Sequence, residues 1–176
     1  MNQRISFWFD ALVFQCAWFG CVLATKTSFP IALPILSLAL VAVRVTACGR
    51  IRQTLPFVAI CAFLGSLGDP ILFHAELISF KGNHLPLGTS WWMLALWINF
   101  GLMLKPIFNW FITSKVRSLI GFSLGGMVAY ASGEKLGVLE LTTGRLSFLG
   151  VGALWSIAGL SLHYANNWMK ALDEPR

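Results

Sequence analysis

The chain has 176 residues, of which 57% are hydrophobic and only 11% charged, and its formal net charge is +6. Soluble domains carry roughly 25% charged residues, so this composition excludes an ordinary water-exposed surface. The 13 Lys and Arg residues are scattered as singles and pairs beside apolar segments. They do not gather on one face as in a nucleic-acid groove, so no nucleic-acid partner is expected.

Six apolar segments follow one another along the chain, each near the roughly 20 residues that a transmembrane helix needs. They predict an all-α, polytopic integral membrane bundle of about six transmembrane helices, in a single domain over residues 1–176. The expected helices cover residues 7–24, 30–48, 55–80, 90–112, 118–138 and 146–168.

The first apolar segment has two interpretations. Val22-Leu23-Ala24 resembles a signal-peptide cleavage site, but Asp10 and Gln15 interrupt the apolar core and only Arg4 precedes it. These features favour a retained first helix. Asp10 is close to the N-terminus and is then expected to be solvated or to pair with Arg4.

The next three segments contain prolines and cations whose positions carry structural predictions. Arg44 lies near the end of the second segment, where its long side chain can reach the interface. The third segment begins with Pro56 in its first turn. The fourth contains Lys105-Pro106, which predicts a kink because proline removes a backbone donor and clashes with the preceding turn. Lys105 is also expected to extend toward the interface.

The fifth segment is the least apolar, because Glu134 and Lys135 interrupt it after residue 132. It is counted as spanning, and a re-entrant segment is the alternative. Small residues at intervals of four give this helix a smooth face that favours close helix packing. The residues of this face are Gly121, Gly125, Gly126 and Ala129.

The distribution of positive residues between alternate loops predicts the orientation. With the N-terminus in the cytoplasm, the cytoplasmic side holds the larger set of cations. That set is Arg4, Arg50, Arg52, Lys115, Arg117, Lys170 and Arg176, against Lys26, Lys81, Lys135 and Arg145 on the other side. Both termini are therefore expected in the cytoplasm.

Asp69 is the strongest candidate for an intramembrane polar site, since a charge inside an apolar helix costs roughly 2.5 to 3.5 kcal/mol on insertion scales. Gly65 and Gly68 allow close backbone approach beside it, and Pro70 leaves the carbonyl of Ser66 without its helical donor. Such a carboxyl could bind a cation, a proton or a polar head group. The structural alternative is an interhelical hydrogen bond or a neutral, protonated carboxyl.

Other polar residues in the apolar segments have weaker claims to function. On a continuous helix Glu76 would return to the face of Asp69, with His74 offset from both, at a spacing too long for one metal ion. Interfacial exposure is the alternative for both residues. Polar residues that could cross-link helices by hydrogen bonds are Gln15, Asn99, Asn109 and His163. No metal site and no cofactor are expected, because no familiar catalytic or ligand-binding motif occurs.

Several short motifs lie in order along nearly the whole chain. They are Phe14-Gln15-Cys16-Ala17-Trp18-Phe19-Gly20-Cys21-Val22, Gly68-Asp69-Pro70, Pro86-Leu87, Trp91-Trp92-Met93-Leu94-Ala95-Leu96-Trp97 and Gly125-Gly126-Met127-Val128-Ala129-Tyr130, followed by Gly133 and Gly137. In this order the chain resembles the bacterial membrane family of unknown function DUF2878. The resemblance implies a multi-pass protein of the bacterial inner membrane. It also implies a role near fatty-acyl-modifying enzymes, whose genes family members often accompany.

Two functional hypotheses of different classes remain open from the sequence. The first is a non-catalytic accessory factor in membrane-lipid or fatty-acyl modification, with membrane lipid and a membrane or lipid-modifying protein as partners. The second is a small transporter or proton-coupled permease that uses Asp69. A membrane enzyme, with Asp69, Glu76 and His74 as its acid-base set, ranks third.

Overall fold

The structure is a computed structural model that describes residues 3–82 and 85–173. In these residues the chain forms six α-helices, a short 3-10 helix and two short strands. In chain order they are α1 (Gln3–Val22), η1 (Leu23–Lys26), α2 (Ala32–Ala47), α3 (Ile51–His74), β1 (Ile78–Phe80), α4 (Trp91–Ile112), α5 (Lys115–Lys135), β2 (Leu139–Leu141) and α6 (Arg145–Asp173). The prediction of an all-α helical bundle is confirmed.

Four of these helices are long and apolar enough to cross a membrane: α1 with its η1 extension, α3, α4 and α6. Helix α2 is apolar but has 16 residues, and α5 has 21 residues but is less apolar. Large hydrophobic side chains such as Leu36, Phe63 and Leu149 are exposed, while Asp69 and Asn99 are fully buried. This inverted distribution is the pattern of a protein whose solvent is lipid.

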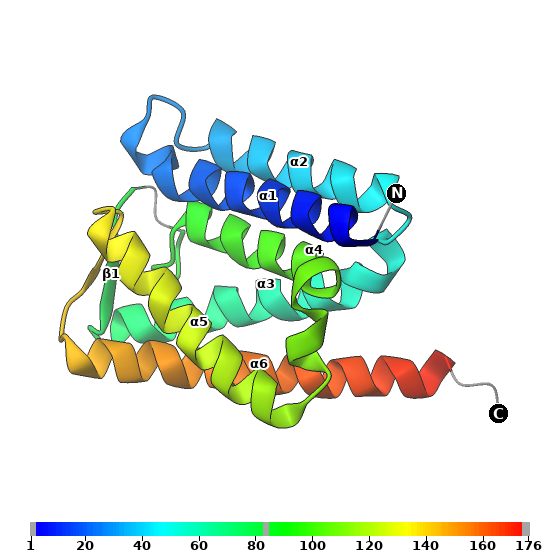
Figure 1. Cartoon of the computed structure of the whole chain (residues 1–176). Helices are drawn as coiled ribbons and strands as arrows, with labels where there is room; N and C mark the ends of the chain where they lie inside the picture. The colour runs from blue at the N-terminus through cyan, green and yellow to red at the C-terminus, as the bar shows by residue number, and fades with distance from the viewer. Residues whose placement is uncertain (1–2, 83–84, 174–176) are drawn as a thin grey trace.

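The helices run alternately in opposite directions, so both termini lie at one end of the bundle (Figure 1). The strands β1 and β2 lie at the opposite end, where they pair antiparallel with Ile78 opposite Leu141. Helix α4 is central: it contacts α1, α2, α3, α5 and α6. Helix α1 packs against α2 and α4.

The third helix ends at His74, and the expectation that it continues to residue 80 is wrong. Its end has the backbone hydrogen bonds of a Schellman motif, from Leu77 N to Leu72 O and from Glu76 N to Phe73 O. The residue with positive φ in this motif is Glu76, at 58°. Glycine usually occupies that position, which is why the sequence does not signal the helix end.

Helices α2 and α5 end in the same motif, there with glycine at the positive-φ position. These glycines are Gly49, at φ 67°, and Gly137, at φ 68°. For α5 the helix covers Lys115–Lys135 rather than residues 118–138, because it begins directly after Ser114 and stops two residues before Gly137.

Helix α4 contains Pro106, and its second half turns away from the direction of its first half (Figure 1). The first half packs beside α1, whereas residues of the second half contact α6: Lys105 Nζ lies 2.6 Å from Asn166 Oδ1, and Ile112 O lies 2.8 Å from His163 Nδ1. The bend predicted at Lys105-Pro106 is therefore present. It directs α5, which follows immediately, toward α6 and away from α1.

Candidate functional site

Asp69 is fully buried where α3, α4 and α5 meet. One carboxyl oxygen accepts a hydrogen bond of 2.9 Å from the indole N–H of Trp97, and the other accepts a short hydrogen bond from the hydroxyl of Tyr130. Both donors are themselves buried. Asp69 thus joins three helices through two hydrogen bonds. Interhelical hydrogen bonding is the structural role that the sequence offers as the alternative to a functional site.

Trp97 and Tyr130 also line a cleft of about 630 Å³ on the side away from Asp69. Its floor is α4, and its walls come from the second half of α1 and from α5. Helices α1 and α5 do not pack extensively against each other. Phe19 and Val128 belong to the walls and are exposed, so the cleft opens sideways between the two helices.

The interior of the cleft is aromatic. Trp97 stacks on Trp155 of α6 with ring centroids 4.5 Å apart, and Phe100 packs edge-on against Trp155 at 5.2 Å. Phe108 continues this layer, 5.1 Å from Phe100 and 5.5 Å from Phe14 of α1. Fixed rings of this kind present apolar surface with little conformational freedom, which suits a hydrocarbon ligand.

The small residues of α5 serve two different contacts. A Cβ on Gly126 would overlap the ring of Trp155, so this glycine permits the close approach of α5 to α6. A Cβ on Gly121 would overlap the ring of Phe111, whereas a Cβ on Gly125 would meet nothing within 4 Å. All four residues of the face line the cleft, but only at Gly125 does the structure leave open space for a larger side chain among the three glycines.

The other candidate residues are not gathered at Asp69. Gln15 lines the cleft from α1. His74 and Glu76 are exposed at the end of α3, and Glu76 lies outside the helix, so the expectation that it shares a helical face with Asp69 is wrong. Within the described residues there is no group of three His, Cys, Asp or Glu side chains that could hold a metal ion.

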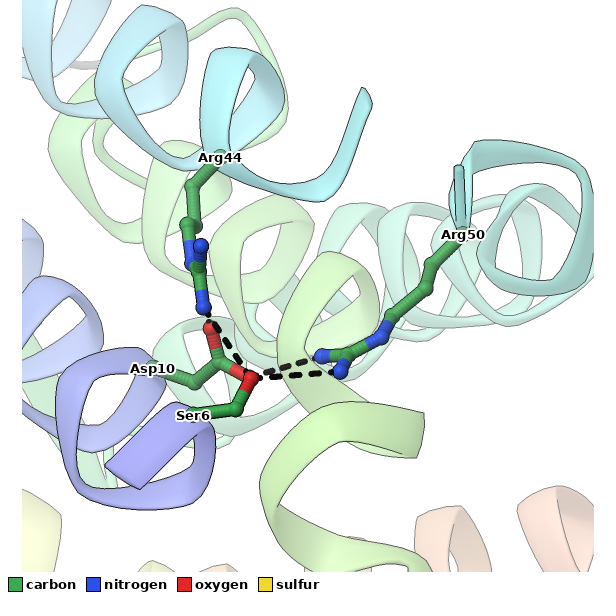
Figure 2. Close-up of polar contacts among 4 residues, drawn as sticks. All are labelled: Ser6, Asp10, Arg44 and Arg50. Atoms are coloured by element: carbon green, nitrogen blue, oxygen red, sulfur yellow. Dashed lines mark hydrogen bonds and ion pairs between the residues drawn. The ribbon is translucent and has the colours of Figure 1, made fainter. Parts of the chain in front are cut away.

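A second buried carboxylate joins α1 to α2 and α3 near the N-terminus, as Figure 2 shows. Asp10 is 2% exposed, and its two oxygens lie 2.6 Å from Arg44 Nε and 2.7 Å from Arg50 Nη1. Ser6 Oγ accepts further hydrogen bonds from both guanidinium groups. Arg44 thus turns into the bundle, rather than extending to the interface as expected.

Some residues that form interhelical hydrogen bonds are predicted from the sequence for this role, and others are not. His163 Nδ1 lies 2.8 Å from Ile112 O, and Asn99 Nδ2 donates to Cys21 Sγ. Lys105 does not extend to the interface: its amine donates to Asn166 of α6 and lies 5.5 Å from the ring of Phe57. Trp97 and Tyr130 were also missed as partners of Asp69, because aromatic residues in apolar helices carry no polar signal.

Comparison with known proteins identifies a family. The family model described as "Protein of unknown function (DUF2878)" matches residues 7–160. No curated protein and no solved structure matches the chain significantly. The match includes Asp69, both partners of its carboxyl group and the whole cleft lining, and on this extent the chain belongs to the DUF2878 family.

Proposed function

We propose that this protein binds membrane lipid, holding an acyl chain in the cleft between α1 and α5 without transforming it. The observation that carries the proposal is the cleft itself: about 630 Å³, aromatic, and open sideways toward the apolar outer surface of the bundle. Its volume is within the range of roughly 300 to 1,000 Å³ that is usual for small-ligand sites. A lipid chain can enter such a cleft from the bilayer without crossing water.

The lining supports binding rather than chemistry. Among the described residues, those that line the cleft include no His, Cys, Asp or Glu. The lining residues that could act as an acid, a base or a nucleophile are Tyr130, Ser132 and Lys135, and the hydroxyls of Tyr130 and Ser132 already donate to Asp69 and to Val128 O. The protein is therefore proposed as an accessory factor that holds lipid in the bacterial inner membrane for a lipid-modifying or other membrane protein.

Photocrosslinking tests the proposal directly. The purified protein is placed in bilayer nanodiscs that contain a trace of phospholipid with a diazirine on its acyl chain, and the crosslinked peptides are identified by mass spectrometry. Occupied clefts give crosslinks on residues 14–22 and 121–136 above the level found on the outer face of α2, at Leu36 and Val43. Equal labelling of all exposed apolar faces would contradict a bound lipid.

A matched pair of variants makes the test specific. Gly125→Leu places a side chain in the cleft, where the backbone has room for it, and replaces a helical glycine with a better helix former. Ala153→Leu adds a side chain of the same size on an exposed face of α6 that does not line the cleft. Gly125→Leu is expected to remove the excess crosslinking, and Ala153→Leu to retain it.

The alternative is a permease that uses Asp69, and the contacts of Asp69 determine how a transported proton or solute could reach it. Trp97 and Tyr130 stand between Asp69 and the cleft and occupy both of its oxygens. A solute that reaches Asp69 from the cleft would have to move at least one of these two side chains. Flux measurements on Asp69→Asn in proteoliposomes separate this hypothesis from lipid binding, since a coupling carboxyl cannot be replaced by an amide.

A further inference from the structure

One end of the cleft carries positive charge. Lys135, the last residue of α5, is exposed and belongs to the cleft lining. Lys26, the last residue of η1, does not itself line the cleft, but its Nζ lies 3.6 Å from the point that a Cβ on Gly137 would occupy. Lys135 lies two residues before Gly137, so both lysines are close to the turn that follows α5.

The neighbouring carboxylates do not neutralise this end of the cleft. Glu134 accepts a hydrogen bond of 3.0 Å from Leu141 N, which directs its carboxylate to β2. Glu140 alternates in β2 with Leu139 and Leu141, and since Leu139 lines the cleft, Glu140 lies on the opposite face of the strand. In the described part of the chain neither lysine forms an ion pair.

The remaining depth of the cleft is hydrocarbon-like, as the rings of Phe100, Phe108 and Phe122 show. Along its axis the cleft thus changes from aromatic to cationic, and the cationic end lies beside the β1–β2 pair. An amphiphile with an apolar chain and an anionic head matches this order. Lysines near a membrane surface attract anionic head groups by about fivefold in binding for each lysine.

We propose that the occupant of the cleft is an anionic phospholipid, with an acyl chain between α1 and α5 and its phosphate at Lys135 and Lys26. The phospholipid comes from the bilayer leaflet on the side of the β1–β2 pair. The sideways opening favours a phospholipid over a free fatty acid, because the second chain of a phospholipid can stay in the bilayer. This inference rests on the proposed lipid-binding function and adds the class of lipid.

The test compares two lipids with the same chains and different heads. Phosphatidylglycerol or phosphatidylcholine competes with the diazirine phospholipid in nanodiscs, and the loss of crosslinking on residues 121–136 gives the relative affinity. Wild-type protein is expected to prefer phosphatidylglycerol by at least about fivefold. In the double variant Lys26→Gln/Lys135→Gln the preference is expected to fall to about one. The control Arg145→Gln, an exposed cation at the same end of the bundle but outside the cleft, keeps it.

Each alternative outcome identifies what is wrong. A wild-type protein without head-group preference, or a double variant that keeps it, overturns the anionic lipid, and the proposed function stands if Gly125→Leu still removes crosslinking. If Gly125→Leu leaves crosslinking unchanged, the proposed function fails instead. Displacement by oleate but not by phosphatidylglycerol overturns the phospholipid in favour of a free fatty acid.

Discussion

The carboxylate of Asp10 in α1 lies 2.6 Å from the guanidinium Nε of Arg44 in α2, with Arg50, at the start of α3, on its other oxygen. One buried acid thus connects the first three helices (Figure 2). Removing one partner of a buried ion pair leaves an uncompensated charge, which costs roughly 3 to 5 kcal/mol.

Asp10→Ala is therefore expected to lower the free energy of unfolding by about 3 kcal/mol, toward the lower end of that range because Arg50 is partly exposed. Thermal unfolding in detergent, followed by tryptophan fluorescence, measures the change. Glu140→Gln, which alters an exposed acid in β2, serves as the control and should unfold close to the wild type. Equal midpoints for the two variants would mean that the Asp10 cluster does not stabilise the bundle.

At Asp69 the expected order of stability is wild type, then Asp69→Asn, then Asp69→Leu. The amide oxygen of Asn can accept from Trp97 and its amide nitrogen can donate to the Tyr130 oxygen, so one bond is kept and one reversed. Leucine leaves two buried donors without acceptors, at about 1 to 3 kcal/mol each. Unfolding midpoints of the three proteins test this order.

A second comparison at Asp69 concerns function. If the carboxyl group only joins helices, Asp69→Asn keeps the acyl crosslinks on residues 121–136, because Trp97 and Tyr130 keep their places in the cleft. Loss of crosslinking in Asp69→Asn at a temperature where the variant is still folded would show that the carboxyl group contributes to ligand binding.

Neighbouring glycines of α5 should respond in opposite directions to the same substitution. Gly126→Ala places a Cβ against the ring of Trp155 and is expected to destabilise the α5–α6 contact by roughly 1 to 3 kcal/mol. Gly125→Ala has open space and should be neutral or stabilising by up to about 1 kcal/mol. Unfolding midpoints measured side by side decide the matter, and destabilisation by both variants would mean that the Gly125 face is packed rather than open.

The proposed orientation, with both termini in the cytoplasm, has its own test. Both termini lie at one end of the bundle, so one fusion site reports on both (Figure 1). Green fluorescent protein fused after residue 176 is expected to be fluorescent, and alkaline phosphatase at the same place inactive, because each enzyme or fluorophore matures on only one side of the inner membrane. The reverse result would place the termini, and the Asp10 cluster, outside the cytoplasm.

The sequence predicts an all-α bundle of apolar helices, because their apolar length and the small number of charges are properties of local composition. It also predicts the bend at Pro106 and the interhelical role of His163. It does not predict the end of α3, since a Glu rather than a Gly adopts positive φ there. Local composition cannot show such an exception.

The cleft could not be predicted in the same way. It depends on where α5 lies relative to α1, which follows from the bend in α4 and from the close contact of Gly126 with Trp155. Small residues at intervals of four indicate close helix packing, but they do not show which of two adjacent glycines contacts the neighbouring helix. Only the tertiary arrangement shows that Gly126 is covered while Gly125 is open.

The pairing of β1 with β2 has a consequence for the order of assembly. Ile78 and Phe80 of β1 are buried against the rest of the bundle, yet their strand partners, Leu141 and Leu139, are synthesised only after α4 and α5. Since chains emerge from the ribosome N-terminus first, β1 is synthesised before its strand partner, with α4 and α5 between the two. The β1–β2 pair can therefore form only after α4 and α5 have been synthesised. A chain that stops before residue 139 would lack the strand partner of β1, which directly follows the end of α3.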